Sequence, residues 1–193
     1  IYVGKEASRH TLPQESIIDL MVRLARSGRS LVRLKGGDGF IFGRGGEEVL
    51  ALAEAGIAFE VVPGITAAQG AGACAGIPLT HRDHAATLVF ATGHLRGDNE
   101  LALDWEALAR PRQTVVIYMG VGKLPTICGE LVRHGLPAQT PAALVEQASL
   151  PGQRCITGTL QDLPQLAQQH RVRAPALIVV GEVVGLQPQL MRG

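Results

Sequence analysis

The sequence is poor in aromatic residues, in cysteines and in net charge, and each shortage excludes a class of protein. Aromatic residues make up 4% of the 193 residues, so the core has to be built from Val, Leu, Ile and Ala. Lys and Arg number 18 and Asp and Glu number 17, which leaves no basic excess for phosphate contacts and argues against a nucleic-acid partner. No apolar run is long enough to cross a bilayer, so we expect no membrane partner.

The three cysteines, Cys74, Cys128 and Cys155, lie far apart in the sequence. They form no CxxC pair and no Cys/His cluster, so neither a disulfide framework nor a metal site is expected. This usage is typical of a reduced, cytoplasmic protein. The sequence is rich in glycine, with 24 residues, and in hydrophobic residues, at 46%. That combination favours an α/β fold with many tight turns.

Apolar patterning predicts three strand–loop–helix units in succession in the first part of the chain. Such a succession favours a parallel sheet with helical crossovers. The expected strands are Ile1–Val3, Ser30–Leu34 and Ala58–Val62, and the expected helices are one that opens at Pro13 and stops at Gly28, then Glu47–Ala55 and Ile65–Ala75.

The pattern changes near Thr80–His84, and we place a domain boundary there, with one domain at 1–83 and a second at 84–193. Short strands and helices continue through the second domain. The expected strands are Ala86–Ala91, Thr114–Tyr118, Ala142–Glu146, Cys155–Gly158 and Ala176–Val180, and the expected helices are Trp105–Ala109, Gly122–His134 and Gln161–His170.

Several loops follow the expected strands, where ligands of open α/β sheets bind. They are Gly36–Gly46, Pro63–Ala68, Met119–Gly122 and Glu146–Ala148. In the first loop, Gly36 and Gly37 would let backbone amides approach a ligand, and Asp38 could accept hydrogen bonds from a hydroxyl or amine. The loop is neither a Walker A sequence nor a dinucleotide fingerprint, so ATP and NAD are disfavoured.

Each of these features also has a purely structural interpretation, and both interpretations stay open. The glycines could serve turns alone, Thr66 could cap a helix, and Met119 could pack in the core. His81 and Arg82 could belong to a solvated linker. The chain offers no paired carboxylates, no Ser/His/Asp set and no Cys/His pair, so hydrolase chemistry has no support.

Taken together, the segments resemble the uroporphyrinogen-III C-methyltransferases of the tetrapyrrole methylase family, either the stand-alone enzyme or the methyltransferase half of a sirohaem synthase. The resemblance runs in order along nearly the whole chain. The matching segments are Tyr2–Lys5, Pro13–Glu15, Arg33–Asp38, Phe40–Glu48, Val62–Ala67, Ala75–Arg82, Thr92–His94, Ile117–Val121 and Ala176–Val183.

The resemblance implies a two-domain tetrapyrrole methylase fold, with a parallel sheet in the first domain, a mixed sheet in the second and S-adenosylmethionine in the cleft between them. It implies a homodimer that methylates two adjacent pyrrole rings of uroporphyrinogen III to give precorrin-2, on the route to sirohaem, cobalamin or haem d. Lys5 matches the position of a proton donor. The positions that match cofactor-binding residues are Gly36, Gly37, Asp38, Ile41, Thr66, Ala67, Met119 and Ala148.

The substrate that this resemblance implies carries many carboxylates, which suit the guanidinium forks of Arg33, Arg44 and Arg82. The chain also departs from the family pattern. Gly39 stands where the family has proline, Cys74 stands where it usually has tyrosine, and the family's first strand, glycine-rich loop and second strand have no counterpart in this sequence. Two alternatives stay open: another precorrin methyltransferase, or a catalytically inactive cofactor-binding fragment.

Overall fold

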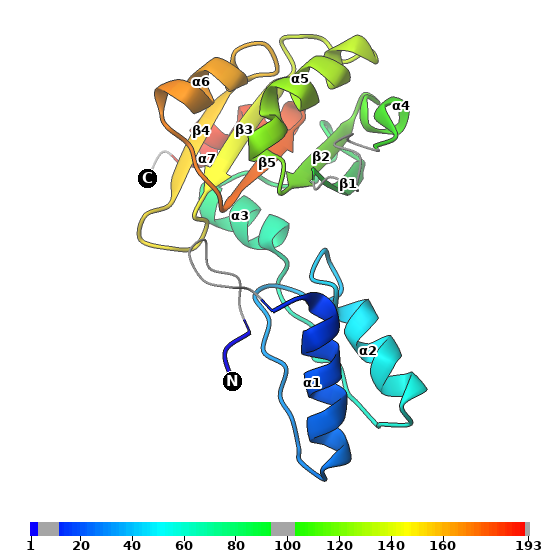
Figure 1. The fold of residues 1–193 in the computed structure, drawn as a ribbon. Coiled ribbons are helices and arrows are strands. Elements are labelled where there is room, and N and C mark those ends of the chain that lie inside the picture. Colours follow the sequence, from blue (N-terminus) through cyan, green and yellow to red (C-terminus); the bar gives the residue numbers. More distant parts are fainter. Residues whose placement is uncertain (4–11, 94–102, 192–193) are drawn as a thin grey trace. The chain divides into compact units, whose positions relative to one another are not determined.

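The computed structural model describes residues 1–3, 12–93 and 103–191, and the chain divides into two compact units (Figure 1). Unit 1 is Ile1–Ile65 and unit 2 is Thr66–Gly193. The sequence placed the boundary later, between 83 and 84. The difference arises because the helix α3 (Ala67–Ala75) buries its small side chains within unit 2 and contacts that unit's sheet.

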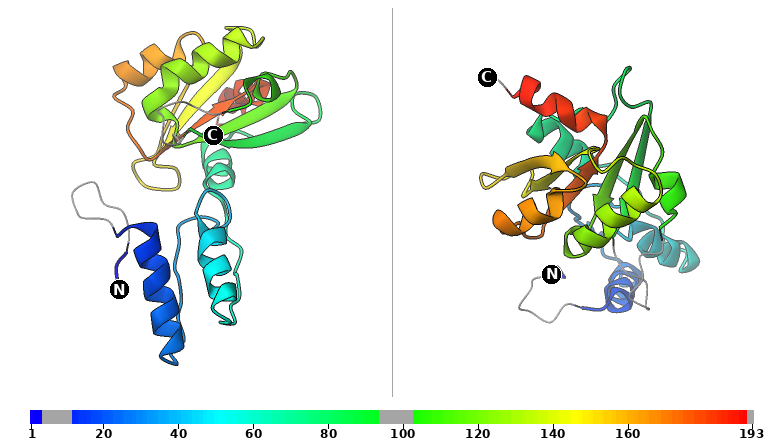
Figure 2. Two further views of the ribbon diagram at one scale, coloured as in Figure 1. Left: turned by 45° about the vertical axis from the view of Figure 1, so that its right-hand side comes forward. Right: turned by 90° about the horizontal axis from the view of Figure 1, so that it is seen from above.

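Unit 1 is built on two helices, α1 (Gln14–Arg26) and α2 (Gly45–Glu54), which pack against each other (Figure 2). Both were predicted by their apolar spacing. Pro13 immediately precedes α1, in keeping with the tolerance of helix starts for proline. Gly28 adopts a positive φ of 81° just beyond the end of α1, which a residue with a side chain would resist.

The structure corrects the expectation of a parallel sheet in the first domain. Ile1–Val3, Ser30–Leu34 and Ala58–Val62 contain no strand, and they pair with no strand within the described residues of unit 1. Val32 is 92% exposed and Leu34 is 83% exposed. A parallel strand needs a neighbour whose backbone groups complete its ladder, so apolar patterning alone could not establish pairing here.

Unit 2 contains a five-stranded mixed sheet, as the resemblance implied. Its strands are β1 (Thr87–Thr92), β2 (Gln113–Tyr118), β3 (Pro141–Glu146), β4 (Arg154–Thr159) and β5 (Ala176–Val180), in the spatial order β1-β2-β5-β3-β4. β1 and β2 are parallel, whereas β5 is antiparallel to both β2 and β3, and β4 is antiparallel to β3. The strands β1, β2 and β3 therefore run in one direction, and their carboxyl ends lie at the same edge.

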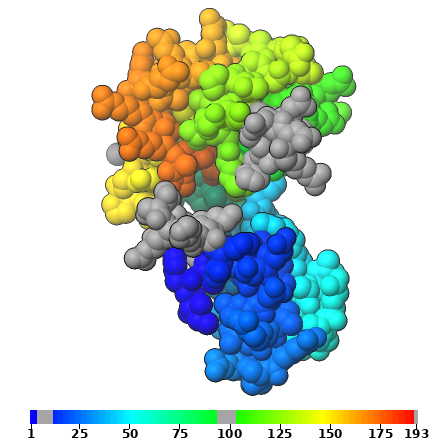
Figure 3. Space-filling model, viewed as in Figure 1, coloured from blue at the N-terminus to red at the C-terminus, as the bar shows by residue number. Residues whose placement is uncertain are grey.

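Helices cover both faces of this sheet (Figure 2). One face carries α5 (Leu124–Arg133) and α6 (Leu163–Gln169), whose side chains form a continuous surface over the strands (Figure 3). The other face carries α3 and α7 (Gln187–Leu190). The remaining short helices are α4 (Trp105–Leu108), η1 (Val121–Lys123) and η2 (Glu182–Leu186). None of the described helices is long and apolar enough to cross a membrane.

The main core of unit 2 lies between the sheet and α5 and α6. Alternate residues of the central strands point toward these helices, which is the period of two expected for strands. The fully buried members of this core include Val115, Ile117, Leu124, Ile127, Leu131, Leu144, Leu163, Ile178 and Val180. The core fixes the strands whose carboxyl ends carry part of the candidate site.

Candidate functional site

In unit 1 the candidate residues Gly36, Gly37, Asp38 and Ile41 lie in one loop between an extended segment and α2. The Ile41 amide donates to the Asp38 carbonyl oxygen at 3.2 Å, which closes a tight turn over Asp38–Ile41. The Gly45 amide donates to the Gly39 carbonyl oxygen at 2.9 Å and ties this turn to the start of α2.

Close backbone packing explains several glycines of this loop. A Cβ at Gly43 would lie 2.7 Å from the Gly39 carbonyl oxygen, and a Cβ at Gly45 would lie 2.6 Å from the same atom. A Cβ at Gly64 would collide with the Gly37 carbonyl oxygen. The chain at Gly64, just after the segment Ala58–Val62, therefore lies directly against the loop. At Gly37 the backbone has a φ of 73°, a conformation that favours glycine, so this glycine serves a turn.

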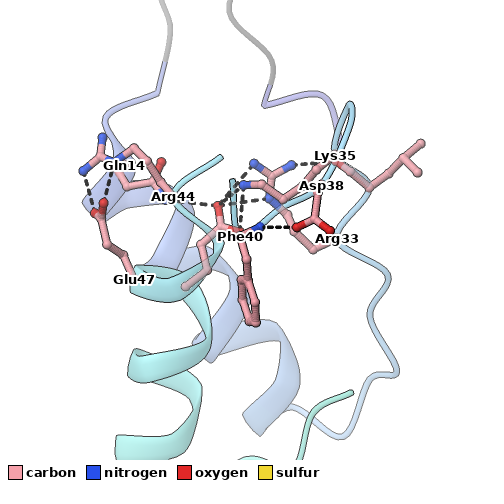
Figure 4. A network of polar contacts seen from close by, with 9 residues as sticks. Gln14, Arg33, Lys35, Asp38, Phe40, Arg44 and Glu47 are labelled. Carbon is pink, nitrogen blue, oxygen red and sulfur yellow. Dashed lines mark hydrogen bonds and ion pairs between the residues drawn. The ribbon is translucent and has the colours of Figure 1, made fainter. Parts of the chain in front are cut away.

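The Asp38 carboxylate binds both the turn that follows it and the chain at Gly64. Its Oδ1 accepts the Phe40 amide at 2.8 Å, as Figure 4 shows, and its Oδ2 accepts the Gly64 amide at 3.2 Å. A carboxylate offers about four lone-pair directions, so two amides leave it able to accept from a ligand hydroxyl or amine. Asp38 can therefore shape the loop and contact a ligand at the same time.

The arginines predicted to bind substrate lie in different surroundings. The Arg33 guanidinium contacts the Glu48 carboxylate at 3.3 Å, and Arg44 forms a two-pronged pair with Glu47 at 2.8 and 2.6 Å (Figure 4). The Glu47 hydrogen bond raises the pKa of Arg44. Arg82 is exposed in unit 2, and its backbone carbonyl accepts a hydrogen bond from Arg112. The guanidiniums of Arg33 and Arg44 are thus already paired with carboxylates.

In unit 2, Thr66 occupies the N-cap position of α3. It is 2% exposed, and its amide donates to Gln69 Oε1 at 3.3 Å. Its hydroxyl lies 2.7 Å from the hydroxyl of Tyr118, which also accepts the Ala68 amide at 3.0 Å. The buried tyrosine hydroxyl therefore supplies the cap of α3 and places Ala67 beside the carboxyl end of β2.

Met119 is the first residue after β2, and it is not a core residue. It is 53% exposed and has a φ of 54°, a conformation uncommon for a residue with a side chain. The adjacent backbone is tightly packed, because a Cβ on Gly93 would lie 2.5 Å from the Gly120 Cα. The structural interpretation as a packing residue does not fit an exposed, strained position, and strain of this kind clusters at functional sites.

Ala148 lies at the same edge, just after β3. Its neighbours Gln147 and Ser149 have φ values of 48° and 67°. The structure thus brings Thr66, Ala67, Met119 and Ala148 to the carboxyl edge of the parallel strands of unit 2, which is where ligands of α/β sheets bind.

Some residues that shape the candidate site carried no clear signal in the sequence. Tyr118 reads as the last core residue of a strand, and only the fold brings its hydroxyl to α3. Glu48 looks in the sequence like one of several charges on a helix, yet it is 3% exposed.

Lys5, the predicted proton donor, lies outside the described residues. Across 1–3, 12–93 and 103–191, no group of three or more His, Cys, Asp or Glu could hold a metal ion.

Comparison with known proteins identifies the family. A family model described as Tetrapyrrole (Corrin/Porphyrin) Methylases matches residues 1–164. The chain belongs to this family. The siroheme synthase of Nitrosomonas europaea is 57% identical over 190 residues, covering 98% of this chain and 40% of the relative. That of Gluconacetobacter diazotrophicus is 59% identical over 184 residues, covering 95% and 39%. The chain therefore spans about 40% of the length of these curated relatives.

Solved methylases have the same fold. The uroporphyrin-III C-methyltransferase of Thermus thermophilus, complexed with S-adenosyl homocysteine, matches with a TM-score of 0.79 and 41% identity over 96% of this chain and 78% of that chain. A cobalt precorrin-4 methyltransferase matches with the same TM-score, 0.79, but 25% identity, over 92% and 73%. The predicted α/β class and tetrapyrrole methylase fold are confirmed.

Proposed function

We propose that this chain is the methyl-transferring part of an S-adenosylmethionine-dependent uroporphyrinogen-III C-methyltransferase, which makes precorrin-2. The observation that carries the proposal is the 41% identity to the Thermus thermophilus uroporphyrin-III enzyme over 96% of the chain. At an equal TM-score, the cobalt precorrin-4 methyltransferase reaches 25%. The fold is common to both, so the sequence difference favours the uroporphyrinogen substrate over a later precorrin.

The candidate residues in the Gly36–Ile41 loop of unit 1 and at the carboxyl edge of the sheet of unit 2 suit S-adenosylmethionine. This ligand has hydroxyls, an amine and a carboxylate. We assign Gly36, Gly37, Asp38 and Ile41 from unit 1 to it. Asp38 has lone pairs left for a ligand donor, and a Cβ at Gly36 would meet nothing within 4 Å, so the backbone there can approach a ligand. From unit 2 we assign Thr66, Ala67, Met119 and Ala148.

When bound, S-adenosylmethionine would supply a methyl group that its positively charged sulfur already activates. The protein then has mainly to align the ring carbon with the sulfur–methyl bond. Such alignment supplies roughly 7–11 kcal/mol of a barrier when near-attack geometry is held. The rigid turn at Asp38 and the strained backbone at Met119 are suited to this task.

For the tetrapyrrole we assign Arg33, Arg44 and Arg82 to its carboxylates and Lys5 to proton donation. Arg44 is half exposed and its pair with Glu47 is a surface pair, so exchange of that partner for a substrate carboxylate has a low cost. Arg82 is exposed. We also propose that the enzyme is a homodimer in the cytoplasm, which light scattering and cell fractionation of the full-length protein would test.

The decisive experiment incubates the full-length protein that carries this chain with uroporphyrinogen III and S-adenosylmethionine. We expect the absorbance of the dimethylated product and the release of two S-adenosylhomocysteines per tetrapyrrole. An Asp38→Ala variant should bind S-adenosylhomocysteine more weakly in calorimetry. Turnover of a later precorrin without turnover of uroporphyrinogen III would contradict the proposed substrate. Binding of the cofactor with turnover of neither compound would identify an inactive protein.

A further inference from the structure

We propose that Glu48 is a positioning residue, which holds Lys35 and Arg33 and through them sets the Gly36–Asp38 loop for its ligand. The proposal rests on the proposed function, since it takes this loop to bind S-adenosylmethionine. Within the described residues, the side-chain hydrogen bonds of Glu48 go to Gln14, Arg33 and Lys35, not to the assigned loop residues. Its role follows from what its carboxylate contacts and from where those partners stand in the chain.

The Glu48 carboxylate is a buried point where three segments meet. It projects from α2 and is 3% exposed. Lys35 Nζ lies 3.0 Å from both of its oxygens, and Arg33 Nε and a terminal nitrogen lie 3.3 Å from Oε1. Gln14 Nε2, from the start of α1, donates to Oε1 at 3.0 Å. Figure 4 shows Gln14, Arg33 and Lys35 converging on this network.

The partners of Glu48 lie directly before the loop. Arg33 and Lys35 are two residues apart in an extended segment, so both side chains point to the same side. Lys35 immediately precedes Gly36, and its Cδ would lie 3.2 Å from a Cβ at Gly39. The lysine stem therefore packs under the turn that begins at Asp38. Fixing the ammonium at Glu48 fixes both the entry and the underside of the loop.

The charge balance keeps this carboxylate ionised. Burial opposes ionisation of Glu48, but hydrogen bonds from Lys35 and Gln14 and the charges of Lys35 and Arg33 outweigh it, so its pKa is lowered. A buried ion pair adds little net stability compared with apolar packing. Its effect here is instead to give Lys35 and Arg33 one defined place each, in a segment with no strand partner within the described residues of unit 1.

The test compares Glu48→Gln with Glu47→Gln in the full-length protein. Both variants lose one carboxylate from neighbouring positions of α2, but Glu47 is exposed, and its ion pair in the described part of the chain is with Arg44, within the same turn. S-adenosylhomocysteine is titrated by calorimetry at a temperature where circular dichroism shows every variant folded. We expect Glu48→Gln to weaken binding about tenfold or more, because hydrogen bonds between charged groups are lost. Glu47→Gln should bind like the wild type.

Kinetic measurements distinguish a positioning role of Glu48 from a role in stability alone. If Glu48 positions the loop, Glu48→Gln raises the KM for S-adenosylmethionine, while kcat at saturating donor stays close to that of the wild type. A role in stability alone lowers the melting temperature and leaves this KM unchanged. Unchanged KM and unchanged affinity for S-adenosylhomocysteine in folded Glu48→Gln would overturn the proposal.

A second variant keeps the test decisive if Glu48→Gln does not fold. Lys35→Met keeps the aliphatic stem and leaves Glu48 paired with Arg33 and Gln14. We expect the same loss of affinity from Lys35→Met alone. If Glu48→Gln does fold, the double variant should lose much less than the product of the two single losses, because both substitutions remove the same Lys35–Glu48 contact. Wild-type affinity in Lys35→Met, or fully multiplicative losses, contradicts the proposal. If the wild type binds no S-adenosylhomocysteine, the proposed function fails instead.

Discussion

At the scale of single residues, the turn over Asp38–Ile41 shows how the loop tolerates a departure from the family pattern. Gly39 is the second residue of this turn, and its φ is not positive. Asp at the first position and Pro at the second are both favoured in turns of this kind. The amide of Gly39 donates no hydrogen bond within the described residues. The backbone therefore keeps a geometry suited to proline, and glycine adds freedom only to the unfolded chain.

We expect Gly39→Pro to stabilise the protein by about 0.4–1 kcal/mol, because proline restricts the unfolded chain and fits the turn. Urea unfolding measures the change. Gly39→Ala is the control, since it adds a Cβ beside Lys35 without fixing φ. A Gly39→Pro protein less stable than Gly39→Ala would show that the backbone at Gly39 does not match proline.

The arginines give a second prediction at this scale. Arg44→Ala and Arg82→Ala should raise the KM for the tetrapyrrole far more than the KM for S-adenosylmethionine, because each is an exposed cation suited to a carboxylate. Steady-state kinetics with each substrate varied in turn measures both constants. Arg133→Ala, on the surface of α5, is a matched control. Equal increases in both constants would contradict the assignment.

At the scale of elements, α3 depends on residues with little or no side chain. Its sequence is AAQGAGACA, and Ala68, Ala71, Gly72 and Ala75 are buried. Small side chains let the helix lie close to the sheet, and the Tyr118 hydroxyl caps its first turn. The two internal glycines are not equivalent. A Cβ on Gly70 would meet nothing within 4 Å, whereas one on Gly72 would lie 2.9 Å from the Ile77 carbonyl oxygen.

We therefore expect opposite effects from the same substitution at two positions of α3. Gly70→Ala should stabilise unit 2 by roughly 0.5–1 kcal/mol, because alanine restricts the unfolded chain more than glycine does. Gly72→Ala should destabilise it, because the added carbon meets the backbone at Ile77. Thermal unfolding of both variants beside the wild type measures the difference. Equal effects of one sign would contradict the close approach at Gly72.

At the scale of the whole molecule, buried apolar residues are distributed unevenly. Within the described residues of unit 1, only Ile17 and Leu52 are buried hydrophobic residues, and Val32, Leu34 and Val62 are more than four-fifths exposed. Unit 2 holds the remaining core, including the central strands β2, β3 and β5. Local stability follows buried apolar contact, so the two units should differ in protection.

For the 193-residue chain, we expect amide hydrogens of α1 and α2 to exchange well before those of β2 and β5. Hydrogen exchange with mass spectrometry measures the order. S-adenosylhomocysteine should slow exchange in Gly36–Gly46 if it binds there, while the helix α6, which holds no assigned residue, is the internal control. Equal protection of α1 and β5 without ligand would contradict the expected difference.

The sequence by itself determined the local elements and the family. Apolar spacing is read within one segment, and it predicted α1, α2 and every strand of unit 2 to within a few residues, with β5 at Ala176–Val180 matched at both ends. Ordered motifs along the chain identified the tetrapyrrole methylase family, because a long series of matches leaves little room for chance. Both kinds of information lie in neighbouring residues and need no knowledge of distant contacts.

Only the tertiary structure decided which distant groups meet. The strands expected in unit 1 did not pair, because a ladder depends on a neighbour that local patterning does not specify. The cap of α3 by Tyr118 and the burial of Glu48 against Lys35 both join residues far apart or on different elements. The same holds for Gly64, whose lack of a side chain matters only because the Gly37 carbonyl lies against it. Contacts of this kind depend on the path of the whole chain.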